Sequence, residues 1–244
     1  MSFNGTEIIN NQRAQVYAGN GGISMKCTGG CNLPVALDDP PYTYPADVPP
    51  AGADWYDPAV PESARFYGIA GLEVIGLSKS PGKRDPVGLV RGGAAIGPYI
   101  LEEREMTWKV LLLGADDCAL SYGLAWLTSA LKGSACLPSM CQGGELCVLT
   151  CCPHCTDEAC GERHVRRVFD VGLMDGPSVT KQTRFGGGVM WEAEFVMVAG
   201  KPWIYRPALA STSTASVTRV QENMRLLTAA STGQAEVLAT LAAA

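Results

Sequence analysis

The chain has 244 residues, of which 47% are hydrophobic and 18% are charged, and its formal net charge is −5. These values indicate a folded chain with a substantial core, and the mild negative charge argues against a nucleic-acid-binding protein, sequence-specific or general. No run of about 18 apolar residues occurs, so no membrane span is expected, and the polar N-terminal segment lacks the apolar stretch of a signal peptide.

Composition divides the chain into four segments. The first holds N-terminal strands and a first cysteine pair, the second is a proline-rich extended arm, the third is a mainly β domain, and the fourth is an arm rich in Ala, Ser and Thr. Their expected bounds are residues 1–37, 38–64, 65–206 and 207–244. The fourth segment is too weakly apolar to hold a core of its own, so we expect it to dock on another subunit.

The proline-rich arm is unusual in its composition. Between Asp38 and Glu62 there are seven prolines and six acids, but no Lys or Arg. Proline fixes φ and removes a backbone donor, so this segment is neither a helix nor a central strand. Its aromatic residues distinguish it from a free linker. We therefore expect an extended arm across its own domain or a neighbour's, with Trp55 or Tyr56 as an assembly contact.

The mainly β domain begins with a short strand, Gly71–Leu77, and a glycine-rich stretch, Ser78–Gly97. This stretch predicts either an ordinary solvated loop or a protruding hairpin. Its basic residues suit contact with an acidic partner. We expect three of them to be assembly contacts: Lys83, Arg84 and Arg91.

A long strand and a helix follow. In Tyr99–Gly114, apolar residues alternate with others, which predicts one strand. Asp116 or Asp117 can cap a helix that runs to about Lys132, where Gly133 is placed to end it. The helix has one apolar stripe with spacings of four, three and four residues, formed by Leu120, Leu124, Leu127 and Leu131.

Two more amphipathic strands lie beyond residue 163. In the first, Val165, Phe169 and Val171 alternate with Val168 and Asp170. In the second, one face is apolar and consists of Val189, Trp191, Ala193, Phe195 and Met197. A glycine run at 186–188 predicts the turn between them. This order of elements predicts an α+β, mainly β fold: a β-sandwich or split barrel with one flanking helix and extended arms.

Cysteines are the other prominent feature. There are ten, and eight of them fall between Cys118 and Cys160. We expect Cys118 to be a small buried residue near the helix start. The others lie mainly in the segment 134–163, which we expect to be a long loop without regular structure. Disulfides, bound zinc and unpaired thiols all remain open, and disulfide pairing cannot be deduced from sequence.

The disulfide and zinc hypotheses use overlapping residues. The disulfide candidates are Cys27, Cys31, Cys136, Cys141, Cys147, Cys151, Cys152, Cys155 and Cys160. The zinc candidates follow a C-x2-C-x4-C-x3-H spacing that would suit a tetrahedral structural site: Cys152, Cys155, Cys160 and His164. An alternative zinc set combines Cys136 and Cys141 with Cys152 and Cys155. Apart from this possible zinc, we expect no cofactor.

We expect no enzyme. The chain has only two histidines, His154 and His164, so a catalytic triad has little to draw on. The glycine run at 186–188 lacks the spacing of a phosphate-binding loop. A small zinc-binding structural or interaction module remains the alternative function at this point.

Several stretches resemble minor tail proteins of long-tailed actinobacteriophages, within the broader group of distal tail proteins. The resemblance lies in the order of five stretches: WYDPAVPESARFYGI at 55–69, YGLAWL at 122–127, GGELCVLTCCP at 143–153, RRVFDVGLMDGP at 166–177 and AGKPWIYRP at 199–207. Each alone is a weak motif, and together they extend over much of residues 1–207.

The resemblance implies a structural virion protein. Distal tail proteins form a ring that joins the tail tube to the tail-tip complex, and their core resembles the tube protein. It implies a ring of copies of this chain, most often a hexamer. It also implies contacts with the tail tube protein, the tail-tip hub, other minor tail proteins and the tape measure protein in the lumen. The chain would be assembled in the host cytoplasm and would function at the virion tail tip.

Overall fold

The computed structural model describes residues 1–22, 33–34, 41–42, 52–79, 82–88, 92–133, 143–149, 164–185 and 187–205. All of them belong to one compact unit, Met1–Pro207, whereas Ala208–Ala244 form a second unit that lies outside the described residues. The expected Cys27 and Cys31 pair, Arg91, residues 38–40 and 43–51 of the proline-rich arm, and the C-terminal arm also lie outside them.

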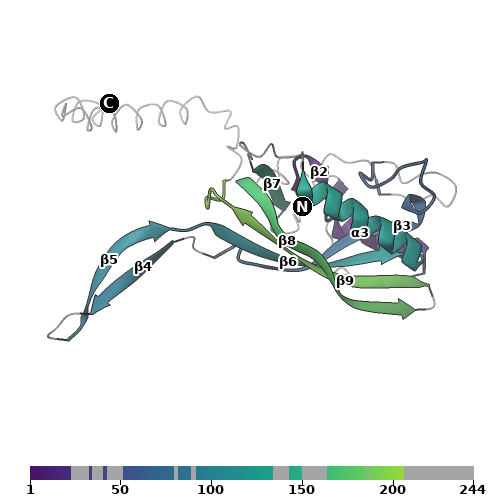
Figure 1. The fold of residues 1–244 in the computed structure, drawn as a ribbon. Helices are drawn as coiled ribbons and strands as arrows, with labels where there is room; N and C mark the ends of the chain where they lie inside the picture. The colour runs from purple at the N-terminus through teal and green to yellow at the C-terminus, as the bar shows by residue number, and fades with distance from the viewer. Residues whose placement is uncertain are drawn as a thin grey trace, which may run out of the picture. The chain divides into compact units, whose positions relative to one another are not determined.

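Antiparallel strands dominate the described unit (Figure 1). In chain order the elements are β1 (Ser2–Phe3), β2 (Thr6–Glu7), α1 (Asn11–Asn20), the 3-10 turn η1 (Ser63–Arg65), β3 (Phe66–Ile75), β4 (Gly82–Gly88), β5 (Ala94–Leu101), β6 (Arg104–Gly114), α3 (Asp117–Lys132), β7 (Gly144–Leu149), β8 (Val165–Phe185) and β9 (Gly188–Ala199). The α+β, mainly β fold class is therefore confirmed.

Seven strands form one sheet in the order β2-β1-β7-β8-β9-β6-β3, and β4 and β5 form a separate two-stranded sheet. Figure 1 shows α3 lying across one face of the larger sheet. Helix α3 packs on β3, β6, β8 and β9 of this sheet, and α1 packs on β3 and β6. In the part of the chain that the structure describes, helices and not a second large sheet thus cover the core face of these strands.

The core follows the alternation of the two central strands. From β6, the side chains of Met106, Trp108, Val110 and Leu112 are buried, as the sequence pattern predicted. The apolar face predicted for β9, which pairs with β6, is also buried. Trp108 is stacked on Phe195 of that strand at a ring-centroid distance of 6.3 Å. The expected strand Tyr99–Gly114 is interrupted, however, because Glu102 and Glu103 separate β5 from β6.

Helix α3 matches its sequence prediction. The side chain of Asp116 accepts a hydrogen bond from the Ala119 amide at 2.9 Å, and Gly133 ends the helix with φ of 64°. Of its leucine stripe, Leu120, Leu127 and Leu131 are buried and Leu124 is partly buried. Burial of one stripe against the sheet provides most of the stability of such a helix.

Helix α1 was not expected, because the N-terminal segment was predicted to contain strands only. Two short strands, β1 and β2, do form, but residues 11–20 are helical. The Asn10 side chain caps α1 by accepting from the Arg13 amide at 3.0 Å. Ala14, Tyr17 and Ala18 are fully buried, with the spacing of one helix face.

A bulge in β8 overturns one detail of its predicted alternation. Val168 and Val171 were expected on opposite faces, but both are buried. Asp170 lies between them with φ of 61°, and the register with β7 shifts there. One extra residue reverses the alternation, so both valines face the core. The Asp170 side chain stabilises the bulge by accepting from the Gly143 amide at 3.0 Å.

Candidate assembly surface

The hairpin β4–β5 is the most exposed element of the described unit. It projects from the seven-stranded sheet (Figure 1), and every described residue of its strands is exposed except the half-buried Gly82 and Gly97. Ser78–Gly97 was predicted to be a loop or protruding hairpin, and the structure shows the hairpin. At its tip, Gly92 and Gly93 have φ of 89° and 85°, which favours glycine.

Another glycine of the hairpin, Gly97, explains why β4 tolerates a proline, Pro86. The register shifts between Arg84 and Pro86, where the two strands approach each other closely. A Cβ on Gly97 would lie 2.7 Å from the Asp85 carbonyl oxygen, so any larger residue would force the strands apart. Glycine at 97 therefore permits the bulge, and the bulge accommodates Pro86.

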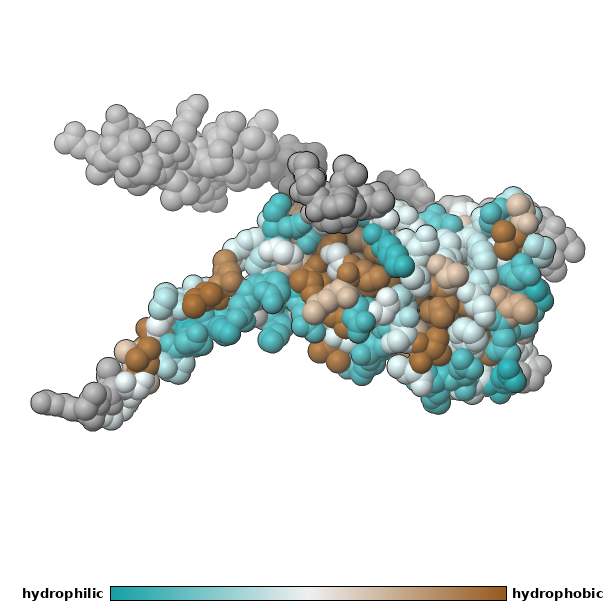
Figure 2. Space-filling model, viewed as in Figure 1, coloured by the Kyte–Doolittle hydropathy of each residue, from teal (hydrophilic) through white to brown (hydrophobic). Residues whose placement is uncertain are grey.

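Large apolar side chains cover this hairpin. They are Val87 (63% exposed), Ile96 (73%), Tyr99 (47%), Ile100 (45%) and Leu101 (43%). Figure 2 shows hydrophobic residues along the hairpin interleaved with hydrophilic ones. A two-stranded hairpin alone in water is marginally stable at best, and its apolar residues gain nothing while they remain exposed. These residues together form a surface suited to contact with another polypeptide.

Two of the three basic residues expected as assembly contacts, Lys83 and Arg84, lie on the same hairpin. Lys83 Nζ is 2.5 Å from Glu102 Oε1, and this hydrogen bond raises the pKa of Lys83. The Arg84 guanidinium lies over the Tyr99 ring, 5.7 Å from its centroid. Both residues are exposed, but Lys83 already has a carboxylate partner in Glu102, the residue that follows β5.

The sheet edge at β3 is a second exposed apolar region. Leu72, Val74 and Ile75 are 55%, 36% and 50% exposed. Just before them, the Asn11 side chain pairs with both backbone groups of Gly71: it accepts from the amide at 2.7 Å and donates to the carbonyl at 3.2 Å. This edge borders a groove of about 430 Å³ that is lined mainly by apolar side chains, including Leu77, Trp108 and Val148.

The structure corrects the prediction that Trp55 is an assembly contact. It is only 2% exposed and belongs to the core of its own chain. Its ring meets those of Tyr17, Phe66 and Trp126 edge to face, and its Nε1 donates to the Phe66 carbonyl at 3.3 Å. Of the two expected locations, its own domain or a neighbour's, the structure shows the first. Burial makes Trp55 unavailable to a partner.

Tyr56 is partly buried and packs against the same core. Residues that fix this segment come from η1 and α3. The Ser63 hydroxyl donates to the Asp57 carbonyl at 2.7 Å, and the Tyr122 hydroxyl donates to the Trp55 carbonyl at 2.5 Å. The proline-rich arm from residue 52 onward is thus integrated into the domain.

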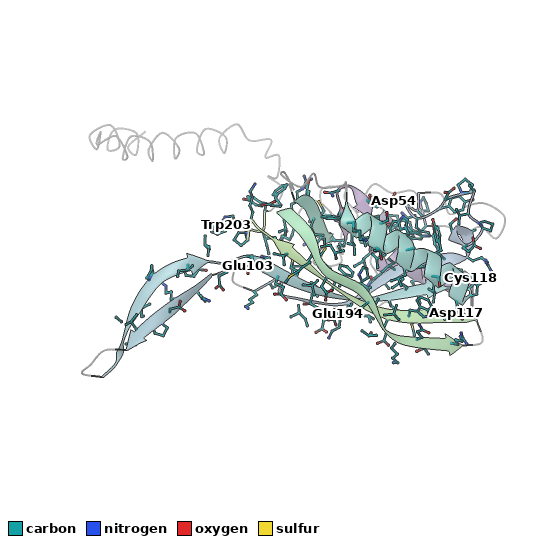
Figure 3. The ribbon with its side chains drawn as sticks, viewed as in Figure 1. Asp54, Glu103, Asp117, Cys118, Glu194 and Trp203 are labelled. Carbon is teal, nitrogen blue, oxygen red and sulfur yellow. The ribbon has the colours of Figure 1, made fainter. Side chains whose placement is uncertain are left out.

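Two cysteines are described, and both differ from expectation. Cys118 is exposed at the start of α3, beside Asp117 (Figure 3), although it had been predicted to be buried. Cys147, a disulfide candidate, has a free thiol within β7, and its Sγ donates to Glu145 Oε1 at 3.4 Å. Burial, followed by the effect of Glu145, raises the pKa of this thiol.

The segment 134–163 was expected to be an irregular loop, but residues 144–149 form β7, which pairs with β1 and β8. The zinc candidates Cys152, Cys155 and Cys160, and the disulfide candidates Cys136, Cys141 and Cys151, lie outside the described residues. His164 is described and half-buried. Within the described ranges, no three His, Cys, Asp or Glu residues come together as a metal site. The zinc and disulfide hypotheses therefore stay predictions.

Sequence reasoning missed the exposed apolar residues of the hairpin and of β3. The sequence did contain an indication of the hairpin residues: Val87, Ile96 and Ile100 lie in or next to a glycine-rich stretch, where an ordinary solvated loop would carry polar residues.

Among the described helices, none is both long and apolar enough to cross a membrane.

No model of a known protein family matches the chain, and no curated protein matches it. Solved structures do match, among them the crystal structure of the Dit protein (gp 19.1) of SPP1, described as a paradigm of the hub adsorption apparatus in phages that infect Gram-positive bacteria. The two chains are 14% identical with a TM-score of 0.33, and the match covers 60% of this chain and 49% of that one. This chain thus matches about half the length of the SPP1 protein.

Proposed function

We propose that the chain is a structural subunit of a bacteriophage tail, which forms a ring at the distal end of the tail and joins the tail tube to the tail-tip complex. The observation that carries this proposal is the projecting hairpin β4–β5, on which large apolar side chains such as Val87 (63%) and Ile96 (73%) are exposed. The order of the five sequence stretches that resemble distal tail proteins supports the same function.

Two different exposed surfaces support the proposal of a ring. The hairpin and the β3 edge are different surfaces, so contact between the hairpin of one copy and another surface of the next is heterologous. Heterologous contacts generate rings when the rotation closes, and a closed ring leaves no apolar surface of this kind unpaired. We propose a hexamer, with the tail tube protein, the tail-tip hub and other minor tail proteins as axial partners and the tape measure protein in the lumen. The place of action is the virion tail tip.

Native mass spectrometry of the purified full chain tests self-assembly. The expected result is a discrete oligomer, six copies in the simplest case, that negative-stain electron microscopy shows as rings. A chain that stays monomeric up to the highest soluble concentration contradicts self-assembly into a ring.

A variant pair tests the part played by the hairpin. Ile96→Lys places a charge where the side chain is 73% exposed, so the fold is expected to be unchanged while the oligomer dissociates. Ser129→Lys, at an exposed position on α3, is the matched control and is expected to assemble like the unmodified chain. Equal assembly of both variants would show that the hairpin is not an interface.

A further inference from the structure

Arg104, the first residue of β6, occupies an unusual position at the base of the hairpin. It is only 6% exposed, and its guanidinium donates hydrogen bonds to four backbone carbonyls. Nη1 bonds to the oxygens of Gly76 at 3.1 Å, Leu77 at 2.7 Å and Lys79 at 2.6 Å, and Nε bonds to that of Pro202 at 2.9 Å. One side chain therefore joins the segment that leads into the hairpin, the strand that leaves it and the segment that follows β9.

No carboxylate forms an ion pair with Arg104 in the described part of the chain. Its charge is offset by carbonyl dipoles, and burial lowers its pKa. Burying a cation without a counter-ion is costly unless its donors are satisfied. A planar guanidinium with five donors can hold several carbonyls at fixed angles, which a lysine ammonium on a flexible stem cannot do.

The backbone around Arg104 leaves little room for movement. Gly76 has φ of 93°, and a Cβ at this position would lie 2.0 Å from the Glu105 carbonyl oxygen. The turn that enters the hairpin is therefore pressed directly against the first residues of β6. The Lys79 amide closes this turn by donating to the Gly76 carbonyl at 3.1 Å. Figure 3 places Glu103 at the same junction, where the hairpin returns to the sheet.

We propose that Arg104 fixes the direction in which the hairpin β4–β5 projects from the seven-stranded sheet, and that it couples this direction to the segment after β9 through Pro202. The hairpin strands are exposed along their length, so their orientation depends on the contacts at the base. Arg104 is thus a positioning residue. If the proposed assembly function holds, a hairpin whose direction is already fixed loses less conformational entropy when it docks on a partner.

The orientation of the hairpin is measured within one chain. Two nitroxide labels are attached through p-acetylphenylalanine at Val87 and Ser129, because the ten cysteines preclude thiol labelling. The Ile96→Lys substitution is present throughout to keep copies separate, so the result does not depend on ring formation. Pulsed electron paramagnetic resonance then gives the distribution of distances between the hairpin and α3. Hydrogen exchange reports on two hydrogen-bonded amides: that of Lys79, which donates to the Gly76 carbonyl, and that of Tyr205, which donates to the Arg167 carbonyl.

The variants are Arg104→Met, which removes all donors at similar volume, and Arg104→Lys, which keeps the charge but not the planar fork. Arg84→Met on the hairpin is the control. The parent is expected to give a narrow distance distribution. Both Arg104 variants are expected to broaden this distribution about twofold. They are also expected to speed exchange of the Lys79 and Tyr205 amides about tenfold, with exchange in β9 unchanged. Arg84→Met is expected to match the parent.

Two results overturn the proposal. In the first, the parent distribution is as broad as that of Arg104→Met, so the direction is not fixed. In the second, the Arg104 variants keep both the narrow distribution and slow exchange. If Arg104→Met unfolds, which rapid exchange in β9 would reveal, the same criteria apply to Arg104→Lys and to Gly76→Ala, which separates the turn from β6.

Discussion

Replacement of Trp55 by Ala should destabilise the fold strongly, although Trp55 lies in a proline-rich stretch that resembles a linker. The side chain is 2% exposed and packs edge to face against Tyr17, Phe66 and Trp126. Truncation of a buried Trp to Ala costs about 3–5 kcal/mol, and the Phe66 carbonyl would also lose its donor. For a domain of this size the loss corresponds to a fall in Tm of about 6–20 °C.

The assay is urea unfolding followed by far-UV circular dichroism, which does not depend on the fluorescence of the removed indole. Trp203→Ala is the matched control: this Trp is 50% exposed, so its loss is expected to change the free energy of unfolding by less than about 0.5 kcal/mol. If the two variants lose similar stability, the placement of Trp55 in the core is wrong. Loss of assembly with unchanged stability in Trp55→Ala would instead restore its role as an assembly contact.

Three further predictions concern other parts of the unit. Glu7→Gln should lower the free energy of unfolding by about 1–3 kcal/mol, because Arg13, only 3% exposed, would lose its carboxylate at 2.8 Å. Glu73→Gln, in the exposed pair with Lys109, should leave it nearly unchanged in the same urea assay; equal losses would contradict this. Gly123→Ala should destabilise the fold by about 1–3 kcal/mol, although Ala has a better helix propensity than Gly, since a Cβ at position 123 would lie 2.2 Å from the Phe66 ring. A gain in Tm would show that α3 can move away from Phe66. Brief iodoacetamide treatment followed by peptide mapping should modify exposed Cys118 at least about tenfold faster than Cys147, whose pKa is raised by burial; the reverse order would place Cys118 in the core.

The sequence predicted the elements whose signals are local and regular. Asp116, the leucine stripe and Gly133 mark both ends and the buried face of α3, because capping and periodicity are properties of a few neighbouring residues. The alternation in β6 and β9 likewise predicted their core faces. The hairpin could be anticipated from its glycines, but only as an alternative to a loop.

Features that depend on distant contacts could not be predicted. The bulge at Asp170 reverses an alternation that appears regular in the sequence. Trp55 is buried because α1, β3 and α3 bring Tyr17, Phe66 and Trp126 around it, and no pattern near residue 55 indicates this. Arg104 is one arginine among many until the fold brings Gly76, Leu77, Lys79 and Pro202 to its guanidinium. The polar composition of α1 concealed a helix whose buried face consists of only a few residues.

Electron cryomicroscopy of the phage particles that contain this chain tests the proposed function most directly. The account predicts a ring of this chain at the distal end of the tail tube, in which the hairpin of each copy contacts a neighbouring subunit and Ile96 is buried. Density for the chain elsewhere in the particle, or a ring in which the apolar residues of the hairpin remain exposed to solvent, would contradict it.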